Sequence, residues 1–326
     1  MKRSSQFATV LACALALSVL VTACGSPSSQ NSAGNETNTT GQAAKATFPV
    51  TLTDDAGKQV TVKSMPQHIA SGTEGTDEIL VSLIPTSKIS LVTNLSSDPT
   101  YSNVVNQVKG IPQMSNADAE KILSVHPDLV LLASYVKPGI VDQIRNSGVP
   151  VYEFNDFTSV DSIEKNIKVV GQLVGATDKA NALVNNINSN IKQIQSAVSG
   201  DGSPSVLDYS SYGFAGGKNT TVNDIIQDAG GTNAAANLDG WQKISDEEIV
   251  KMNPDVIIDS EADKAFLTKL AQRPDLQSVT AIRKHQMYAI PDADLSSVSQ
   301  YIVKGMVDLA KDIHPKSSIP NLQVMQ

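Results

Sequence analysis

Two carboxylates stand at matched places in two copies of one short pattern. The first copy runs from Asp118 to Leu131 and the second from Ser245 to Ile258, without a gap, so equivalent residues are always 127 positions apart. Glu120 and Glu247 each lie two residues after the start of their copy. An ionised side chain at this place can stabilise the start of a helix through the helix dipole, or it can point outward and bind a guanidinium group.

Each copy predicts a short helix that feeds a buried strand. Asp118 and Ser245 are residue types that cap helix N-termini, and an apolar pair follows each glutamate. Pro127-Asp128 or Pro254-Asp255 comes next, ahead of a run of Leu, Val and Ile. That run is typical of a strand covered on both faces. One unit repeated once at this separation predicts two similar lobes.

The rest of the chain alternates between strand and helix patterns. Before residue 177 we expect a hairpin at 50–62, strands at 68–71, 88–93 and 149–154, and helices at 76–84, 141–147 and 160–174. After residue 200 we expect strands at 205–209 and 287–290 and helices at 221–228 and 296–312. This alternation predicts an α/β fold of two Rossmann-like lobes with parallel sheets.

One long helix is predicted between the lobes. From Asp178 to Ser199 the apolar residues recur at helical spacing, with no glycine or proline inside. Such a helix would span about 33 Å at 1.5 Å per residue. We therefore expect an N-terminal lobe over residues 48–177, a connecting helix over 178–200 and a C-terminal lobe over 201–326. Because the helix offers no hinge, we expect the lobes to move little when a ligand binds.

Residues 1–23 have the pattern of a secretory leader. Lys2-Arg3 precedes an apolar and small-residue run from Phe7 to Thr22, and Cys24 follows directly after Ala23. This ending resembles the bacterial lipobox, which implies cleavage before Cys24 and a lipid on its thiol. A transmembrane anchor is the alternative, but the run is short for a span and rich in small residues.

The next stretch predicts a flexible tether, and the mature chain is expected to have a single cysteine. Residues 24–47 are mostly Ser, Asn, Gly, Thr, Gln and Ala without an apolar period. Such a tether reaches about 25–30 Å on average. Cys13 lies in the leader, so Cys24 is the one cysteine expected in the mature chain. An internal disulfide or a zinc–cysteine site is thereby excluded.

Composition and motifs argue against several classes of protein function. Removing Lys2 and Arg3 leaves 23 basic residues of the original 25 against 33 acidic ones. An acidic body does not suit nucleic acid. The chain has no Gly-x-Ser-x-Gly or Walker pattern, so we expect no enzyme. A free-metal carrier would need clustered histidines and carboxylates, whereas the four histidines are dispersed, and we expect no metal site or cofactor.

Several stretches together resemble the substrate-binding lipoproteins of ABC importers for ferric siderophores, haem and cobalamin. These are Thr53–Gly57, Pro66–Ser71, Asp77–Leu80, both Pro-Asp repeats, Gly216–Lys218, Asp228–Gly231 and Gly240–Ser245. The resemblance covers residues 50–312. It implies a ligand cleft between the lobes and a stiff connecting helix. It further implies a lipid-anchored monomer on the outer face of the bacterial cytoplasmic membrane, which delivers its ligand to a permease dimer with a cytoplasmic ATPase.

The same resemblance suggests a role for the repeated glutamates. In relatives, one glutamate on each lobe docks onto arginines of the permease, and Glu120 and Glu247 occupy those positions here. Two separated charges would fix orientation and speed encounter more than they add affinity. Helix stabilisation alone remains an alternative for each residue. A surface sensor or adhesin that has lost transport is the rival function, and such a protein would be expected to lack one of the pair.

Ligand contacts are expected in loops that follow the carboxyl ends of the strands. Aromatic side chains offer broad contact area to a flat or greasy chelate. Each candidate also has a structural alternative, as a lid on the core for Trp241 and as ordinary surface or core residues for the others. The candidates are Trp241, Tyr135, Tyr212, Phe214, Asn94 and Leu295.

The charges near the expected cleft narrow the ligand class. Relatives that bind anionic ferric chelates often carry arginine in a stretch that here reads Asp294-Leu-Ser-Ser297, and Arg145, Arg273 and Arg283 are expected elsewhere. A strongly anionic chelate would be poorly neutralised. A neutral hydroxamate siderophore or a corrinoid fits better. Haem needs a ligand side chain, often His or Tyr, so the tyrosines keep haem as an alternative.

Overall fold

The computed structural model describes residues 47–325. These residues belong to one compact unit, Ala43–Gln326. The predicted leader, Cys24 and the tether up to residue 46 lie outside the described residues.

The N-lobe is built on a five-stranded parallel sheet with the strand order β5-β4-β3-β6-β7. A hairpin of β1 (Val50–Thr53) and β2 (Gln59–Val62) precedes it, as predicted. The strands are β3 (Ile69–Ser71), β4 (Ile89–Thr93), β5 (Gln113–Met114), β6 (Leu129–Ala133) and β7 (Val151–Phe154). The helices are α1 (Glu74–Leu83), α2 (Ala119–Ser124), α3 (Pro138–Asn146) and α4 (Val160–Leu173), with 3-10 turns at Thr86–Lys88 and Leu95–Ser97.

The C-lobe repeats this plan on a four-stranded parallel sheet with the order β10-β8-β12-β13. An antiparallel pair, β9 (Phe214–Gly216) and β11 (Trp241–Lys243), is added to it. The sheet strands are β8 (Ser205–Asp208), β10 (Thr232–Asn233), β12 (Val256–Ser260) and β13 (Met287–Ile290). The helices are α6 (Thr221–Asp228), α7 (Asp246–Met252), α8 (Lys264–Leu270), α9 (Thr280–Arg283), α10 (Asp292–Leu295) and α11 (Ile302–Ile313), with 3-10 turns at Glu261–Asp263 and Pro274–Leu276.

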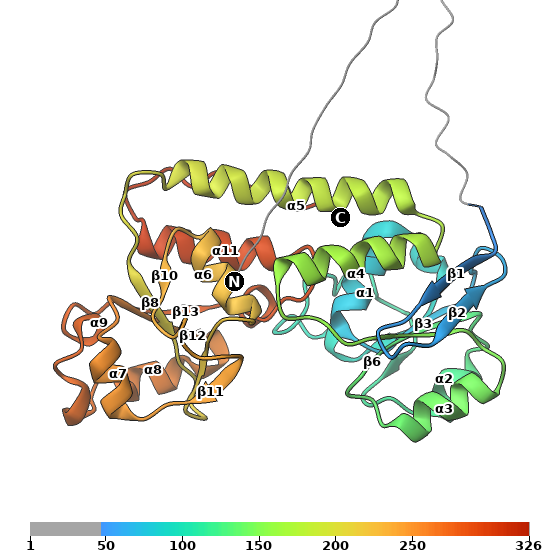
Figure 1. Cartoon of the computed structure of the whole chain (residues 1–326), viewed down its shortest axis with the longest axis horizontal. Coiled ribbons are helices and arrows are strands. Elements are labelled where there is room, and N and C mark those ends of the chain that lie inside the picture. Colours follow the sequence, from blue (N-terminus) through green and yellow to red (C-terminus); the bar gives the residue numbers. More distant parts are fainter. Residues whose placement is uncertain (1–46, 326) are drawn as a thin grey trace, which may run out of the picture. The chain divides into compact units, whose positions relative to one another are not determined.

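Helix α5 (Thr177–Ala197) joins the lobes and packs on both. Figure 1 shows α4 beside one end of α5 and α11 beside its other end. Its buried stripe, including Leu183 and Ile187, belongs to one hydrophobic cluster with residues of α1, α4, α6 and α11. The predicted two-lobed α/β fold with parallel sheets and a long connecting helix is thus confirmed.

Two local predictions were wrong. The closing helix was expected from residue 296, but α11 begins at Ile302. The preceding residues are held in another conformation because the Ser299 hydroxyl donates to the Glu78 carboxylate and accepts from the Tyr301 backbone N–H. Trp241 was expected in a loop, but it lies in strand β11, where it pairs with Gly216 of β9.

The two repeat copies have matching local structure. Asp118 caps α2 by accepting from the Lys121 N–H at 2.7 Å, and Ser245 caps α7 by accepting from the Glu248 N–H at 3.3 Å. Both helices end at a left-handed residue, His126 with φ 49° and Asn253 with φ 46°. These turns release the chain into β6 and β12, as the pattern predicted.

The Pro-Asp step of each copy fastens neighbouring strands. Asp128 accepts from the backbone N–H groups of Gln67 at 2.7 Å and His68 at 3.0 Å, just ahead of β3. Asp255 accepts from the Ser205 N–H at 3.1 Å, where β8 begins. Each aspartate therefore joins the start of its own strand to the start of the neighbouring strand.

Replacing these aspartates should destabilise the protein unequally. Asp128→Ala removes two charge-assisted hydrogen bonds, so we expect a loss of about 1–2 kcal/mol in the free energy of unfolding, which solvent exposure keeps moderate. Asp255→Ala removes one such bond and should cost about 0.5–1.5 kcal/mol. Urea denaturation measures both. Asp142→Ala, an exposed carboxylate on α3, is the control. Equal stability of all three variants would contradict the fastening role.

Candidate functional site

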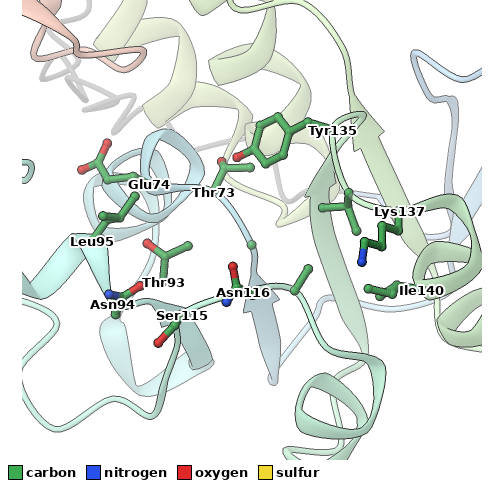
Figure 2. A pocket seen from close by; sticks show the side chains of 13 residues that line it. Thr73, Glu74, Thr93, Asn94, Leu95, Ser115, Asn116, Tyr135, Lys137 and Ile140 are labelled. Atoms are coloured by element: carbon green, nitrogen blue, oxygen red, sulfur yellow. The ribbon is translucent and has the colours of Figure 1, made fainter.

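A pocket of about 370 Å³ lies at the carboxyl ends of the N-lobe strands. Its walls come from the segments after β3, β4, β5 and β6, and Figure 2 shows their side chains around it. In the sheet order β5-β4-β3-β6-β7 the connections change direction between β3 and β6. Open α/β sheets bind ligands at such a switch point. The pocket is lined by Gly72, Thr73, Glu74, Thr93, Asn94, Leu95, Ser115, Asn116, Ala117, Tyr135, Val136, Lys137 and Ile140.

Six of the thirteen residues on the pocket wall have uncharged polar side chains, and they lie beside apolar ones such as Val136 and Ile140. Asn94, Asn116 and Tyr135 can both donate and accept hydrogen bonds. Glu74 and Lys137 add one potential charge of each sign. This arrangement suits a ligand with many neutral donors and acceptors better than one with a high charge.

A buried aspartate positions one side of the pocket. Asp77 of α1 has no exposed surface and accepts from the Thr93 N–H at 2.9 Å, the Thr93 hydroxyl at 2.7 Å and the Ser96 hydroxyl. These bonds hold the segment that carries Asn94 and Leu95. Burial raises the pKa of Asp77 to about 7, although its hydrogen bonds to Ser71, Ser96 and Thr93 oppose the rise.

Tyr135 and Asn94, both predicted from sequence, line this pocket. Tyr135 follows β6, and its side chain is 75% exposed, so it offers a large aromatic face. Desolvation raises the pKa of its phenol, and the charges of Asp77 and Glu74 raise it further. The hydroxyl therefore stays a hydrogen-bond donor at neutral pH.

The other aromatic candidates lie together on the C-lobe. Trp241 of β11 is 51% exposed, and its ring lies over Gly216, where an added Cβ would meet the ring at 3.3 Å. Tyr212 is exposed in the turn between β8 and β9. Phe214 is half-buried, with the Lys243 ammonium 5.4 Å from its ring centre. The structure thus brings together Trp241, Tyr212 and Phe214, on a different lobe from Tyr135 and Asn94.

Leu295 has a structural role in this arrangement. It is buried in the hydrophobic cluster that includes α11, with 7% of its surface exposed. It therefore presents almost no surface to a ligand.

Buried acids occupy the equivalent place in the C-lobe. In the order β10-β8-β12-β13 the connections change direction between β8 and β12, and Asp208 and Asp259 lie at the ends of these strands. Burial, followed by the charge of Asp259, raises the pKa of Asp208 to about 8. Burial first, and then the charges of Asp263 and Asp292, raise the pKa of Asp259 to about 7. Both buried carboxyl groups therefore carry less than a full negative charge at neutral pH.

A second cavity, of about 380 Å³, lies between the lobes. Pro99 and Thr100 form its N-lobe side, and Glu261 and Asp292 lie on its C-lobe side. The arginines lie elsewhere, because Arg145 pairs with Asp54 and Glu153, and Arg273 pairs with Asp246. The region between the lobes thus carries acidic side chains and no arginine among the residues that line these two cavities.

The repeated glutamates are exposed on α2 and α7. Neither Glu120 nor Glu247 makes an ion pair with any residue from 47 to 325. Hydrogen bonds from its own backbone N–H and from the Ser245 hydroxyl lower the pKa of Glu247, so it stays ionised. One helical turn on, Val250 is 38% exposed and Leu123 is half-buried. Each carboxylate thus has an apolar neighbour on its own helix face.

Sequence reasoning missed part of the pocket. Ser115 and Asn116 follow β5, which has two residues and no recognisable strand pattern. Ile140 was not singled out because it belongs to a helix start rather than a strand end. In the described part of the chain, no three His, Cys, Asp or Glu side chains gather closely enough to hold a metal ion. No helix between residues 47 and 325 has the length and apolar character needed to cross a membrane.

Comparison with known proteins places the chain in a family. A periplasmic binding protein family model matches residues 69–293. An uncharacterized ABC transporter substrate-binding lipoprotein of Bacillus subtilis, YvrC, is 31% identical over 318 residues, which cover 94% of this chain and 97% of that protein. A cobalamin-binding protein of Halobacterium salinarum is 26% identical over 278 residues, covering 82% of this chain and 74% of the relative.

Solved structures have the same fold. A possible iron-binding, periplasmic solute-binding protein of Staphylococcus epidermidis matches with a TM-score of 0.69 at 24% identity, covering 77% of this chain and all of that one. The periplasmic haem-binding protein RhuT of Roseiflexus matches with a TM-score of 0.67 at 25% identity, covering 76% of this chain and 98% of the other. The chain therefore belongs to the periplasmic binding protein family and is a substrate-binding protein of an ABC transporter.

Proposed function

We propose that this protein captures a neutral metal chelate, either a corrinoid or a hydroxamate ferric siderophore, and delivers it to an ABC permease dimer. A lipid on Cys24 would hold the protein, as a monomer, on the outer face of the cytoplasmic membrane. The observation that carries the proposal is the N-lobe pocket, which lies at the switch point of its sheet and has uncharged polar side chains, Tyr135 among them, on a wall with one charge of each sign.

The charges around the pocket support a neutral ligand. An anionic chelate would need arginine or lysine to offset the loss of its hydration. Lys137 is the one basic residue on the pocket wall, and Glu74 shares that wall. Asp208 and Asp259 lie at the corresponding ends of the C-lobe strands. A neutral chelate needs no opposite charge on the protein and can use the amide and hydroxyl groups of the pocket instead.

The relatives support two candidate ligands. The cobalamin-binding protein of Halobacterium salinarum aligns with 82% of this chain, which favours a corrinoid. Haem is the second candidate, because RhuT is a haem-binding protein at 25% identity and because Tyr135, a residue type that can bind haem iron, lies in the pocket. None of His68, His126, His285 or His314 lines the pocket, so Tyr135 would be the iron ligand.

We propose that Trp241 and Tyr135 contact the ligand from the two lobes. Trp241 is the single tryptophan, so its emission reports on the C-lobe contact alone. Cyanocobalamin, ferrioxamine, ferric enterobactin and haemin should be titrated against the purified soluble chain. We expect cyanocobalamin or ferrioxamine to change the emission and ferric enterobactin to have no effect. Tyr135→Ala or Trp241→Ala should weaken binding by about 0.5–1.5 kcal/mol, roughly two-fold to tenfold in Kd.

Met65→Ala is the matched control for this titration. Met65 is 40% exposed and precedes β3, at the opposite end of that strand from the pocket. Its replacement should leave the Kd unchanged. Tight binding of ferric enterobactin would contradict the neutral-ligand proposal. An unchanged Kd in both Tyr135→Ala and Trp241→Ala would show that neither side chain contacts the ligand.

We propose that Glu120 and Glu247 dock onto arginines of the permease, with Leu123 and Val250 packing beside them. The double variant Glu120→Ala/Glu247→Ala should keep the fold and the ligand Kd of the parent. It should bind the reconstituted permease complex more weakly and with a smaller salt dependence, because two exposed charges are gone. Measurements of Kd across salt concentrations test this.

A charge-matched control separates docking from net charge. Asp142→Ala/Asp275→Ala removes two exposed carboxylates, one on each lobe, and should bind the permease complex as the parent does. If Glu120→Ala/Glu247→Ala also binds the permease complex as the parent does, the two glutamates have no docking role. Helix stabilisation is then the remaining explanation for them. A parent chain that binds its ligand but no permease complex would instead point to a sensor or adhesin.

The lipid anchor is tested separately. Cys24→Ala should move the protein from the detergent phase to the aqueous phase when cells are extracted with Triton X-114, since the thiol would carry the lipid. Ser26→Ala, two residues away in the tether, is the control and should stay in the detergent phase. Detergent partitioning of the Cys24→Ala chain would rule out this anchor.

A further inference from the structure

A second connection between the lobes lies apart from α5. Glu78 of α1 is 1% exposed, and its two carboxylate oxygens face different lobes. Oε1 accepts from the backbone N–H of Asn103, in the N-lobe, at 2.8 Å. Oε2 accepts from the hydroxyl of Ser299, in the C-lobe. One buried carboxylate thus connects α1 with a segment of the C-lobe 221 residues further along the chain.

Neighbouring side chains extend this connection. Gln300, which is fully buried, donates to the Glu78 carbonyl at 3.2 Å and to the Ser82 hydroxyl at 2.9 Å. Asn103 donates to the Ala293 carbonyl at 3.0 Å and accepts from the Lys304 ammonium. Hydrogen bonds therefore cross between the lobes on both sides of Glu78. We call this set, Glu78, Ser82, Asn103, Ser299, Gln300 and Lys304, the interlobe junction.

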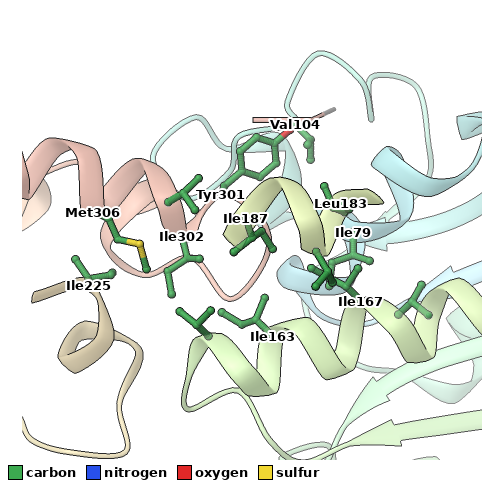
Figure 3. Packing of buried hydrophobic residues seen from close by; sticks show 14 of the residues in the cluster. Ile79, Val104, Ile163, Ile167, Leu183, Ile187, Ile225, Tyr301, Ile302 and Met306 are labelled. Atoms are coloured by element: carbon green, nitrogen blue, oxygen red, sulfur yellow. The ribbon is translucent and has the colours of Figure 1, made fainter. Parts of the chain in front are cut away.

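The backbones of the two lobes also approach closely here. An added Cβ on Gly75 of α1 would lie 2.6 Å from a Val298 methyl group, so glycine is required for this contact. Figure 3 shows the apolar layer of the same region, in which Tyr301 lies beside Val104 and Ile302 belongs to the cluster of α4 and α5. Such close packing leaves little freedom for a change of angle while the junction is intact.

A second acid lies against Glu78. Glu74 is four residues earlier on α1, so the two side chains share one helix face. Two carboxyl groups this close in a buried site repel each other when both are ionised, which favours a state in which one of them holds a proton. Glu74 Oε1 is buried without a partner among residues 47–325, and Glu74 also lines the ligand pocket.

We propose that Glu78 fixes the angle between the two lobes and that a proton shared with Glu74 keeps this junction closed. Glu78 is then a positioning residue, since it sets how the ligand pocket and the two glutamate-bearing helices face a partner. Loss of the shared proton would put two negative charges side by side in a buried site and loosen the junction. This inference does not depend on the identity of the ligand or on the permease.

The groups around the pair set the direction of the pH effect. Burial first, and then Glu78 and Asp77, raise the pKa of Glu74 well above its ordinary value of 4.5, while Ser102 opposes the rise. Burial also raises the pKa of Glu78, against hydrogen bonds from Ser299 and Asn103. The remaining neighbours are Tyr301, whose own pKa rises to about 12 through burial and these acids, and Lys304, which pairs with Asp294 at 3.3 Å.

The sign of the effect follows from these raised pKa values. A carboxyl group whose pKa is raised on folding binds its proton more tightly in the folded chain. Its contribution to stability is complete below pH 4.5, the ordinary pKa of the group. That contribution is lost as the pH rises through the raised pKa of the folded chain. The junction should therefore be closed in acid and should loosen as the pH rises.

Distances between two spin labels test the proposal without a ligand. The mature chain with Cys24→Ser has no cysteine, so labels can be placed at Lys109→Cys on the N-lobe and Lys284→Cys on the C-lobe, both exposed. Double electron–electron resonance from about pH 5 to about pH 9 should give one narrow distance distribution at the acidic end that broadens or shifts as the pH rises. Glu78→Ala should give the broad distribution at every pH.

Two further variants separate this role from general stability. Glu78→Gln keeps an acceptor for the Asn103 N–H and can donate to Ser299, so it should restore the narrow distribution and remove its pH dependence. Ile144→Ala, in a separate apolar cluster of the N-lobe, should lower stability without broadening the distribution. If Glu78→Ala does not fold, Ser299→Ala removes the C-lobe bond of Glu78, leaves its bond to Asn103 and should broaden the distribution. Narrow distributions in the Ala variants at Glu78 and Ser299, or equal broadening in Ile144→Ala, would overturn the proposal.

Discussion

The arrangement of the two lobes depends on one hydrophobic cluster that continues beneath α5. It includes residues of α1 and α4 from the N-lobe and of α6 and α11 from the C-lobe, with the buried stripe of α5 between them. Apolar interiors are close-packed, so a large change of angle would open a cavity or expose part of this cluster. The cluster alone, however, is non-directional and does not choose one angle. The hydrogen bonds of Glu78 to Asn103 and Ser299 supply that direction, because they require particular atoms to meet.

The sequence predicted the structural features that depend on residues close to one another along the chain. The caps at Asp118 and Ser245, the Pro-Asp steps and the strands after them depend on residues a few positions apart, and the repeat made them visible twice. The start of α11 could not be predicted in this way, because Ser299 is held by a carboxylate 221 residues away. Trp241 was placed in a loop for the same reason, since its strand exists only through pairing with Gly216.

The site was predicted in part, with a similar limit. The rule that ligands bind beyond the carboxyl ends of parallel strands indicated the loops that carry Asn94 and Tyr135, and both residues line the N-lobe pocket. It could not indicate Asn116, because β5 is too short to be recognised, nor the burial of Leu295, which depends on packing against distant helices. The role of Asp77 as an acceptor for Thr93 and Ser96 was equally hidden, since a helix acid gives no sign in sequence that it is buried.

Buried acids connect stability with ligand choice in this protein. Asp77, Asp208 and Asp259 have pKa values raised to about 7 or 8, so each carries only part of a full charge near neutral pH. A cationic ligand would draw these groups toward ionisation and would have to compensate their desolvation, whereas an anion would meet residual negative charge without an arginine to offset it. A neutral ligand with many hydrogen-bonding groups escapes both costs. The same acids hold the walls of the pocket and the ends of the strands, so replacing them with arginine to change the ligand class would also remove the contacts that keep the site in place.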